Sequence, residues 1–259
     1  MNPTLIFDCD GVLADTERDG HLVAFNQMWR EKGVNWQWSL QQYAEKVKIG
    51  GGKERMFSLG KDDDFRAVYD VPPSDEEWWD IVAAWHKRKS EIYKELIAAG
   101  ALPGRPGVKR LAQEALERGW SLVVCSTSAL PSVKAVLNHV IGPQLASQFA
   151  GVFAGDMVKN KKPSPAIYNL AVDELNLDPA ACVVVEDSRN GLLAAVADGM
   201  TCIITVNELT QNEDFDEAAI VLSSLGEPHG EQTTVLQNHT AAQPGAYFSI
   251  DDLETIYKP

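Results

Sequence analysis

The chain has 259 residues, of which 45% are apolar and 23% charged, and its net charge is −14. This length and composition indicate a soluble globular protein with a substantial core. The acidic balance argues against a nucleic-acid partner, because phosphate backbones would be repelled. We expect no secretory leader, since Asp8 and Asp10 interrupt the first apolar run. No apolar stretch approaches the roughly 20 residues that span a bilayer, so no membrane partner is expected.

The cysteine residues are predicted to be buried and reduced. All four are widely spaced and lie in or beside apolar runs: Cys9, Cys125, Cys182 and Cys202. A metal site or a disulfide framework would require clustered cysteines, which this sequence lacks. Buried, reduced cysteines agree with a cytoplasmic protein, which we expect. As a separate prediction, the protein is expected to be a monomer.

The predicted elements begin with a short buried strand at residues 5–7. A helix with a periodic apolar face follows over residues 16–32 and stops at Gly33. A second long helix starts at the capping pattern Ser74-Asp75-Glu76-Glu77 and ends before Gly100. No buried strand is predicted between residues 15 and 100, so this part of the chain is interpreted as an all-helical insertion.

After the turn-rich segment 103–107, helices and strands alternate. Continuous apolar strands separated by helices predict a parallel sheet covered on both faces, which is a Rossmann-like α/β core. Residues 227–247 are polar and are predicted to be a surface excursion, and residues 249–257 a terminal helix on the core. The remaining predicted helices are 111–116, 132–139, 166–175 and 191–197, and the strands are 121–125, 151–154, 182–185, 202–206 and 219–222.

These elements predict three parts of the chain. Residues 1–15 and 102–228 form the α/β core, and residues 16–101 form an α-helical cap inserted into it. Residues 229–259 form a C-terminal extension that docks on the core. We expect the cap to swing on linkers near residues 14–17 and 99–104.

Polar side chains follow the predicted core strands at their carboxyl ends. The first strand is followed by Asp8 and Asp10, the second by Ser126-Thr127-Ser128, and the fourth by Glu186-Asp187. Lys161-Lys162-Pro163 lies just ahead of a helix. Because parallel strands end at one edge of a sheet, these groups are predicted to converge there.

Such a cluster of carboxylates needs a compensating cation, since like charges repel. An all-oxygen ligand set favours Mg²⁺ as the cofactor. With a dication, a lysine and a hydroxyl present, the ligand that fits is a phosphoryl group. One carboxylate could then attack phosphorus to give an aspartyl-phosphate while its neighbour transfers protons.

The order of these motifs resembles the haloacid dehalogenase superfamily of phosphatases and phosphomutases, and the helical insertion resembles its cap. The resemblance implies that Asp8 is the nucleophile and a Mg²⁺ ligand and that Asp10 is the general acid/base, with its backbone carbonyl on the metal. Ser126 and Lys162 would hold the phosphoryl group. Glu186 and Asp187 would complete the metal site, with Asp187 the stronger candidate. The second aspartate favours phosphoryl chemistry over carbon–halogen cleavage.

Within that superfamily the cap is similar to the CbbY-type proteins at residues 15–21, 36–39 and 48–56. This resemblance implies a phosphosugar substrate, a sugar bisphosphate such as xylulose-1,5-bisphosphate. The substrate contacts that it implies, or that neighbour the catalytic motifs, are Glu17, His21, Tyr43, Lys48, Gly51, Gly52, Lys53, Arg55, Thr127, Ser128 and Arg189.

Several alternatives stay open at this point. A β-phosphoglucomutase-type phosphomutase would share core, cap and Asp10, and a non-catalytic binding protein is a third hypothesis. Lys161 replaces Lys162 if the register is off by one. His21 could be a buried histidine with a local hydrogen bond, and Arg189 could anchor the helix that follows it. The tryptophans of the insertion are interpreted as packing residues.

Overall fold

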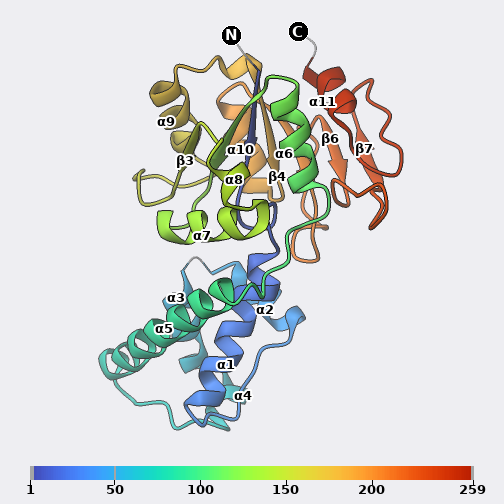
Figure 1. Ribbon diagram of the computed structural model, residues 1–259. Helices are drawn as coiled ribbons and strands as arrows, with labels where there is room; N and C mark the ends of the chain where they lie inside the picture. Colours follow the sequence, from blue (N-terminus) through green and yellow to red (C-terminus); the bar gives the residue numbers. More distant parts are fainter. Residues whose placement is uncertain (1–2, 50, 258–259) are drawn as a thin grey trace. The chain divides into compact units, whose positions relative to one another are not determined.

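The computed structural model describes residues 3–49 and 51–257. The chain divides into two compact units. One contains the residues up to Asp15 together with those from Leu102 onward, and the other contains Thr16–Ala101. Both units are drawn in Figure 1.

The first unit is built on a seven-stranded sheet in the order β3-β2-β1-β4-β5-β6-β7. All neighbouring strands are parallel except β6 and β7, which are antiparallel. The parallel strands confirm the predicted Rossmann-like core. The strands are β1 Thr4–Phe7, β2 Ser121–Cys125, β3 Gly151–Phe153, β4 Cys182–Glu186, β5 Thr201–Thr205, β6 Ile220–Leu222 and β7 Val235–Asn238.

Helices cover the sheet because its central strands are apolar on both faces. Alternate residues of each strand point to opposite faces. Tyr168 and Leu192, from two of the helices, belong to one buried cluster with strand residues such as Ile6 and Val184. The helix α6 packs against β2. The helices of this unit are α6 Val108–Glu117, α7 Leu130–Ile141, α8 Pro143–Ala146, α9 Ala166–Leu175, α10 Arg189–Ala197 and α11 Ile250–Tyr257, with a 3₁₀ turn at Pro179–Ala181.

The cysteines lie in this unit as the sequence predicts. Each is buried and none forms a disulfide: Cys9, Cys125, Cys182 and Cys202. Three of them are strand residues, so they pack as small apolar side chains within the sheet.

The C-terminal segment corrects one prediction. Residues 227–247 are not only a surface excursion, because β7 lies within them and extends the sheet at its β6 edge. This short strand carries Val235 and Leu236 exposed, so it has no buried apolar face that would mark it in the sequence. The terminal helix is confirmed, and α11 lies beside α6 (Figure 1).

The second unit is all-helical, as the sequence predicts. Its first helix is more complex than expected, since Thr16–Leu22 is a π-helix that continues into α1. Ser74 caps the long α5 by accepting a hydrogen bond from the Glu77 amide. The α-helices are α1 Val23–Glu31, α2 Leu40–Val47, α3 Gly52–Phe57, α4 Asp63–Arg66 and α5 Asp75–Ala98, with a 3₁₀ helix at Ser58–Lys61.

Aromatic side chains form the core of this helical unit. Trp29 and Trp38 are buried, and their ring centroids lie 4.6 Å apart in an edge-to-face contact. Trp78 and Trp85 make a similar contact at 5.6 Å. These tryptophans therefore pack the insertion, as expected. Among the residues that the structure describes, none of the helices combines the length and apolar character needed to cross a bilayer.

Candidate active site

The carboxyl end of β1 begins the candidate site. Asp8 follows the strand directly, is 7% exposed, and donates its backbone N–H to the Val185 carbonyl of β4. Gly11 has φ +80°, a left-handed conformation that turns the chain away after Asp10. The turn holds Asp8 at the edge of the sheet, next to the end of β4.

Lys162 is the cation of this cluster. Its side chain is 5% exposed, and Nζ lies 2.7 Å from Asp8 Oδ1 and 2.5 Å from Glu186 Oε1. It also donates to the Cys125 carbonyl at 2.8 Å. The neighbouring Lys161 is exposed, so Lys162 is the lysine that the fold brings to the carboxylates.

Glu186 is held by several donors at once. Besides Lys162, its Oε1 accepts the Tyr168 hydroxyl at 3.1 Å. Its Oε2 accepts the Asp187 amide at 3.1 Å and the Ser188 hydroxyl at 3.4 Å. These bonds make Glu186 the acceptor that positions Lys162. Tyr168 was not anticipated from the sequence, because it lies within an ordinary apolar helix face.

Asp187 contacts the loop after β5. The Asn207 side-chain amide donates to Asp187 Oδ2 at 2.7 Å. Gly11 packs against the same carboxylate so closely that a Cβ at that position would overlap it. Asn207 was likewise absent from the sequence-based candidates.

Burial governs the electrostatics of these groups. It raises the pKa of Asp8 to about 7, against the lowering effect of Lys162 and with Glu186 and Asp10 raising it further. Burial, followed by the charges of Glu186 and Asp8, also raises the pKa of Asp187. Three buried carboxylates thus lie together with one buried ammonium, that of Lys162, which contacts Asp8 and Glu186. When all three are ionised, the cluster has an excess of negative charge.

A divalent cation fits this excess. Asp8, Glu186 and Asp187 each offer a carboxylate oxygen, and these oxygens lie within 4.8 Å of one another. All the donors are hard oxygens, the ligand type that Mg²⁺ takes. Because Glu186 also receives four donors of the chain, Asp8 and Asp187 are the better placed pair for holding an ion.

Asp10 is held by the loop after β2. The Ser128 hydroxyl donates to Asp10 Oδ2 at 2.6 Å, and the Ser126 hydroxyl lies 3.4 Å from the same oxygen. Ser126 Oγ in turn accepts the Ser128 amide at 3.1 Å. Thr127 lies between them and is half-buried. The motifs after β1 and β2 therefore meet, as the parallel topology predicts.

A second buried cation lies beside this edge. The Arg105 guanidinium, 8% exposed, donates to the Gly11 and Thr205 carbonyls and to Val206 O at 2.6 Å. It also lies 3.5 Å from Asp15 Oδ1. Arg105 thereby ties the turn after Asp10 to the end of β5. The sequence places Arg105 in a turn-rich segment, and nothing there predicts these contacts.

Within the helical unit, the structure gathers some of the expected substrate contacts. Tyr43 donates its hydroxyl to Glu17 and accepts from Arg55 Nη1 at 2.9 Å. Arg55 Nη1 also lies 3.3 Å from Glu17 Oε2, and Arg55 Nε donates to the Ile49 carbonyl. Glu17, Tyr43 and Arg55 thus form one hydrogen-bonded cluster. Much of the hydrogen-bonding capacity of the Arg55 guanidinium is taken up by partners within the helical unit.

The other expected contacts of this unit are separate from that cluster. Lys48 is exposed and pairs with Glu45 at 2.6 Å, and Lys53 Nζ lies over the Trp79 ring. His21 Nδ1 lies 2.7 Å from Nζ of the buried Lys89, a hydrogen-bonded contact with a residue 68 positions further along the chain. Gly51 and Gly52 lie at the start of α3, while Gly50 lies outside the described residues.

Arg189 lies at the start of α10, where its guanidinium pairs with Glu217 and donates to the Asp214 carbonyl at 2.9 Å. These bonds anchor the 213–217 loop to the helix, which agrees with the anchoring role considered for Arg189.

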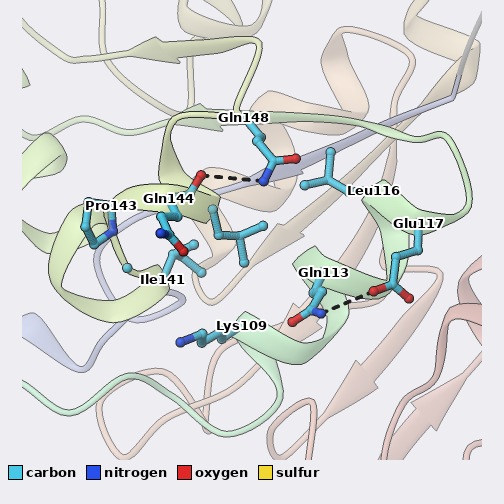
Figure 2. Close-up of a pocket in the computed structure, with 10 residues that line it drawn as sticks. Lys109, Gln113, Leu116, Glu117, Ile141, Pro143, Gln144 and Gln148 are labelled. Atoms are coloured by element: carbon cyan, nitrogen blue, oxygen red, sulfur yellow. Dashed lines mark hydrogen bonds between the residues drawn. The ribbon is translucent and has the colours of Figure 1, made fainter.

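A cavity of about 510 Å³ beside α6 contains none of these groups (Figure 2). Two of its glutamine side chains bond within its wall: Gln113 donates to Glu117 at 3.2 Å and Gln148 to the Gln144 carbonyl at 3.5 Å. Figure 2 labels Lys109, Gln113, Leu116, Glu117, Ile141, Pro143, Gln144 and Gln148 on this wall.

Buried carboxylates, a lysine and two hydroxyls thus lie at the carboxyl edge of a parallel sheet. The sequence model of the haloacid dehalogenase-like hydrolases matches residues 3–198. The chain belongs to that family, and the resemblance drawn from its motifs is confirmed. Together with this family and with relatives such as the “Putative phosphatase YhcW” of Bacillus subtilis, 34% identical over 227 residues, the set of side chains identifies a phosphatase, a hydrolase of phosphoric monoesters.

CbbY proteins are among the chains that this one is similar to. The CBBY-like protein of Arabidopsis thaliana is 46% identical over 231 residues, covering 88% of this chain and 70% of that protein. A crystal structure of CbbY from Rhodobacter sphaeroides in complex with phosphate has a TM-score of 0.70 at 37% identity and covers 86% of this chain and 95% of its own. A variant of that protein in complex with xylulose-(1,5)bisphosphate has the same TM-score and coverages at 36% identity.

Proposed function

We propose that this protein is a Mg²⁺-dependent phosphatase that hydrolyses a sugar bisphosphate, xylulose-1,5-bisphosphate, through an aspartyl-phosphate on Asp8. The observation that carries the proposal is the contact of Lys162 with both Asp8 and Glu186 inside a buried acidic cluster. A nucleophilic carboxylate needs such a cation beside it, because it must approach an anionic phosphoryl group.

Asp8, Asp187 and Glu186 would hold the ion, with the Asp10 backbone carbonyl as a further ligand. When bound, Mg²⁺ supplies positive charge that offsets the charge of the phosphoryl oxygens and lowers the barrier to attack. The closeness of the three carboxylates supports this assignment.

Each residue of the site then has its own role in the reaction. A carboxylate oxygen of Asp8 attacks phosphorus, and the bond from phosphorus to the sugar oxygen breaks. Asp10 gives its proton to that leaving oxygen, and later takes one from the water that attacks the aspartyl-phosphate and releases Asp8. Lys162 and Ser126 hold phosphoryl oxygens, and Thr127 and Ser128 lie beside Ser126 on the same loop.

The substrate part of the proposal comes from the CbbY relatives, one of which is solved with xylulose-(1,5)bisphosphate. Glu17, His21 and Tyr43 would contact the sugar or its second phosphate, together with Lys48, Lys53 and Arg55. Of these basic residues, Lys53 is the one whose charge has no carboxylate partner among the described residues, so it is the stronger candidate for the distal phosphate.

The experiment is steady-state phosphate release from xylulose-1,5-bisphosphate, ribulose-1,5-bisphosphate and β-glucose-1-phosphate, each with Mg²⁺ and with a chelator. A kcat/KM for xylulose-1,5-bisphosphate at least about a hundredfold above the others, and lost with the chelator, is the expected result; a hundredfold corresponds to about 2.7 kcal/mol of transition-state discrimination. Equal and weak rates on all three would contradict the substrate. Conversion of β-glucose-1-phosphate to glucose-6-phosphate would instead identify a phosphomutase.

A further inference from the structure

Asn207 lies where the loop after β5 meets the acidic cluster. Its side-chain amide nitrogen donates to Asp187 Oδ2 at 2.7 Å. Strands β4 and β5 are parallel neighbours in which Glu186 pairs with Ile204, so the residues that follow both strands lie at the same edge of the sheet. The contact is thus a consequence of the sheet register.

The orientation of the Asn207 amide is fixed by its oxygen. Asn207 Oδ1 accepts the backbone N–H groups of Leu209 at 2.8 Å and Thr210 at 3.2 Å. Because an oxygen is required on that side, the NH₂ group must face Asp187. The Asn207 backbone N–H in turn donates to the Thr210 hydroxyl at 3.2 Å, which closes the turn.

Gly11 completes the arrangement from another side. A Cβ at Gly11 would overlap the Asp187 carboxylate and would lie 2.9 Å from Asn207 Nδ2. Asp187 is therefore confined between a glycine that admits it and an amide that binds one of its two oxygens. Asp187 also offers one carboxylate oxygen to the cluster with Asp8 and Glu186. With Oδ2 bound by Asn207, we assign Oδ1 to that role.

We propose that Asn207 is a positioning residue of the metal site, which holds Asp187 Oδ2 so that the remaining oxygen of that carboxylate is aimed at the divalent cation. This inference rests on the proposed function, because it assumes that Asp187 is a ligand. Partners that orient a ligating group typically affect metal affinity or activity by about 10–100-fold.

The test is Mg²⁺ binding to the full chain by isothermal titration calorimetry. Asn207→Ala removes the bond to Asp187 and the turn, whereas Thr210→Val removes only a hydrogen bond of the turn and is the matched control. Asn207→Ala should raise the Mg²⁺ dissociation constant at least about 10-fold, and Thr210→Val should leave it nearly unchanged. In an Asp187→Asn background, the further change at position 207 should cost almost nothing, since both act through one carboxylate.

A second variant keeps the turn intact. Asn207→Asp retains an oxygen for the Leu209 and Thr210 amides but replaces the donor by an acceptor, so kcat at saturating Mg²⁺ should fall about 10-fold or more. Equal effects of Asn207→Ala and Thr210→Val, or an undiminished effect of Asn207→Ala in the Asp187→Asn background, would overturn the inference and leave the proposed function standing. A wild-type chain that binds no Mg²⁺ and releases phosphate in a chelator would overturn both.

Discussion

Replacing Lys162 by methionine removes the cation that the structure buries between Asp8 and Glu186. The side chain is 5% exposed and its Nζ lies 2.7 Å and 2.5 Å from the two carboxylates. Removing one partner of a buried ion pair costs about 3–5 kcal/mol, because the other charge is left without compensation. In a chain of this size that loss lowers Tm by roughly 6–20 °C, at about 2–4 °C per kcal/mol.

The loss should depend on pH in a defined direction. Burial raises the pKa of Asp8 to about 7, and Lys162 is what lowers it most. Without the lysine the pKa of Asp8 rises further, so Asp8 keeps a proton at alkaline pH that the wild type has already released. When folding raises the pKa of a carboxyl group, that group does not destabilise the fold at a pH below its pKa in the unfolded chain. The destabilisation grows with pH and reaches its full size above the pKa in the folded state. The free energy of unfolding that Lys162→Met loses relative to the wild type should therefore be larger at pH 8.5 than at pH 6.

The assay is thermal unfolding in chelator, together with phosphate release in Mg²⁺. We expect a fall in kcat of about 10²–10³, as for the loss of one charge-stabilising group. Lys161→Met is the control, because that neighbouring lysine is exposed. Equal Tm values for the two variants, or a loss of turnover in the Lys161 variant alone, would refute the assignment of Lys162.

Three further outcomes are expected. Gly11→Ala should be less stable and bind Mg²⁺ more weakly. Its Cβ would overlap the Asp187 carboxylate, and the φ of +80° disfavours alanine. Calorimetry that shows unchanged Mg²⁺ affinity would contradict this prediction. Burial, followed by nearby lysines, lowers the pKa of His86 to about 4. The free energy of unfolding should therefore fall as the pH drops from 6.5 towards 4. Denaturant titrations of His86→Gln should show a smaller fall over the same range. Lys53→Met should raise KM for a bisphosphate more than for a monophosphate, and equal changes would exclude contact with a distal phosphate.

The sequence predicts the motifs of the site because of a general property of parallel sheets. Asp8, Ser126 and Glu186 each lie at the end of a continuous apolar strand, and the strand ends must lie at one edge. Their convergence is therefore readable from pattern alone. The particular role of Lys162 was predicted through the resemblance to the family, since it lies in a loop between β3 and α9 whose path no periodicity reveals.

The supporting residues could not be predicted in the same way. Asn207, Tyr168 and Arg105 reach partners that are 20, 18 and 94 residues away, and only the tertiary fold selects those partners. Their side chains occur in a turn, on an apolar helix and in a linker, where such residues are ordinary. The sequence analysis did not predict strand β7 for a similar reason. Its pairing with β6 depends on the neighbouring strand, and its side chains show no alternation of apolar and polar residues.

The measurement that tests the central claim most directly is chemical trapping of the phosphorylated carboxylate. The protein would be quenched during turnover of xylulose-1,5-bisphosphate with Mg²⁺ and reduced with borohydride, which converts an aspartyl-phosphate into homoserine, and its peptides analysed by mass spectrometry. The account predicts homoserine at position 8 and nowhere else, absent when substrate is omitted. Turnover with no modification at Asp8, or with modification at Asp10 or Asp187, would contradict it.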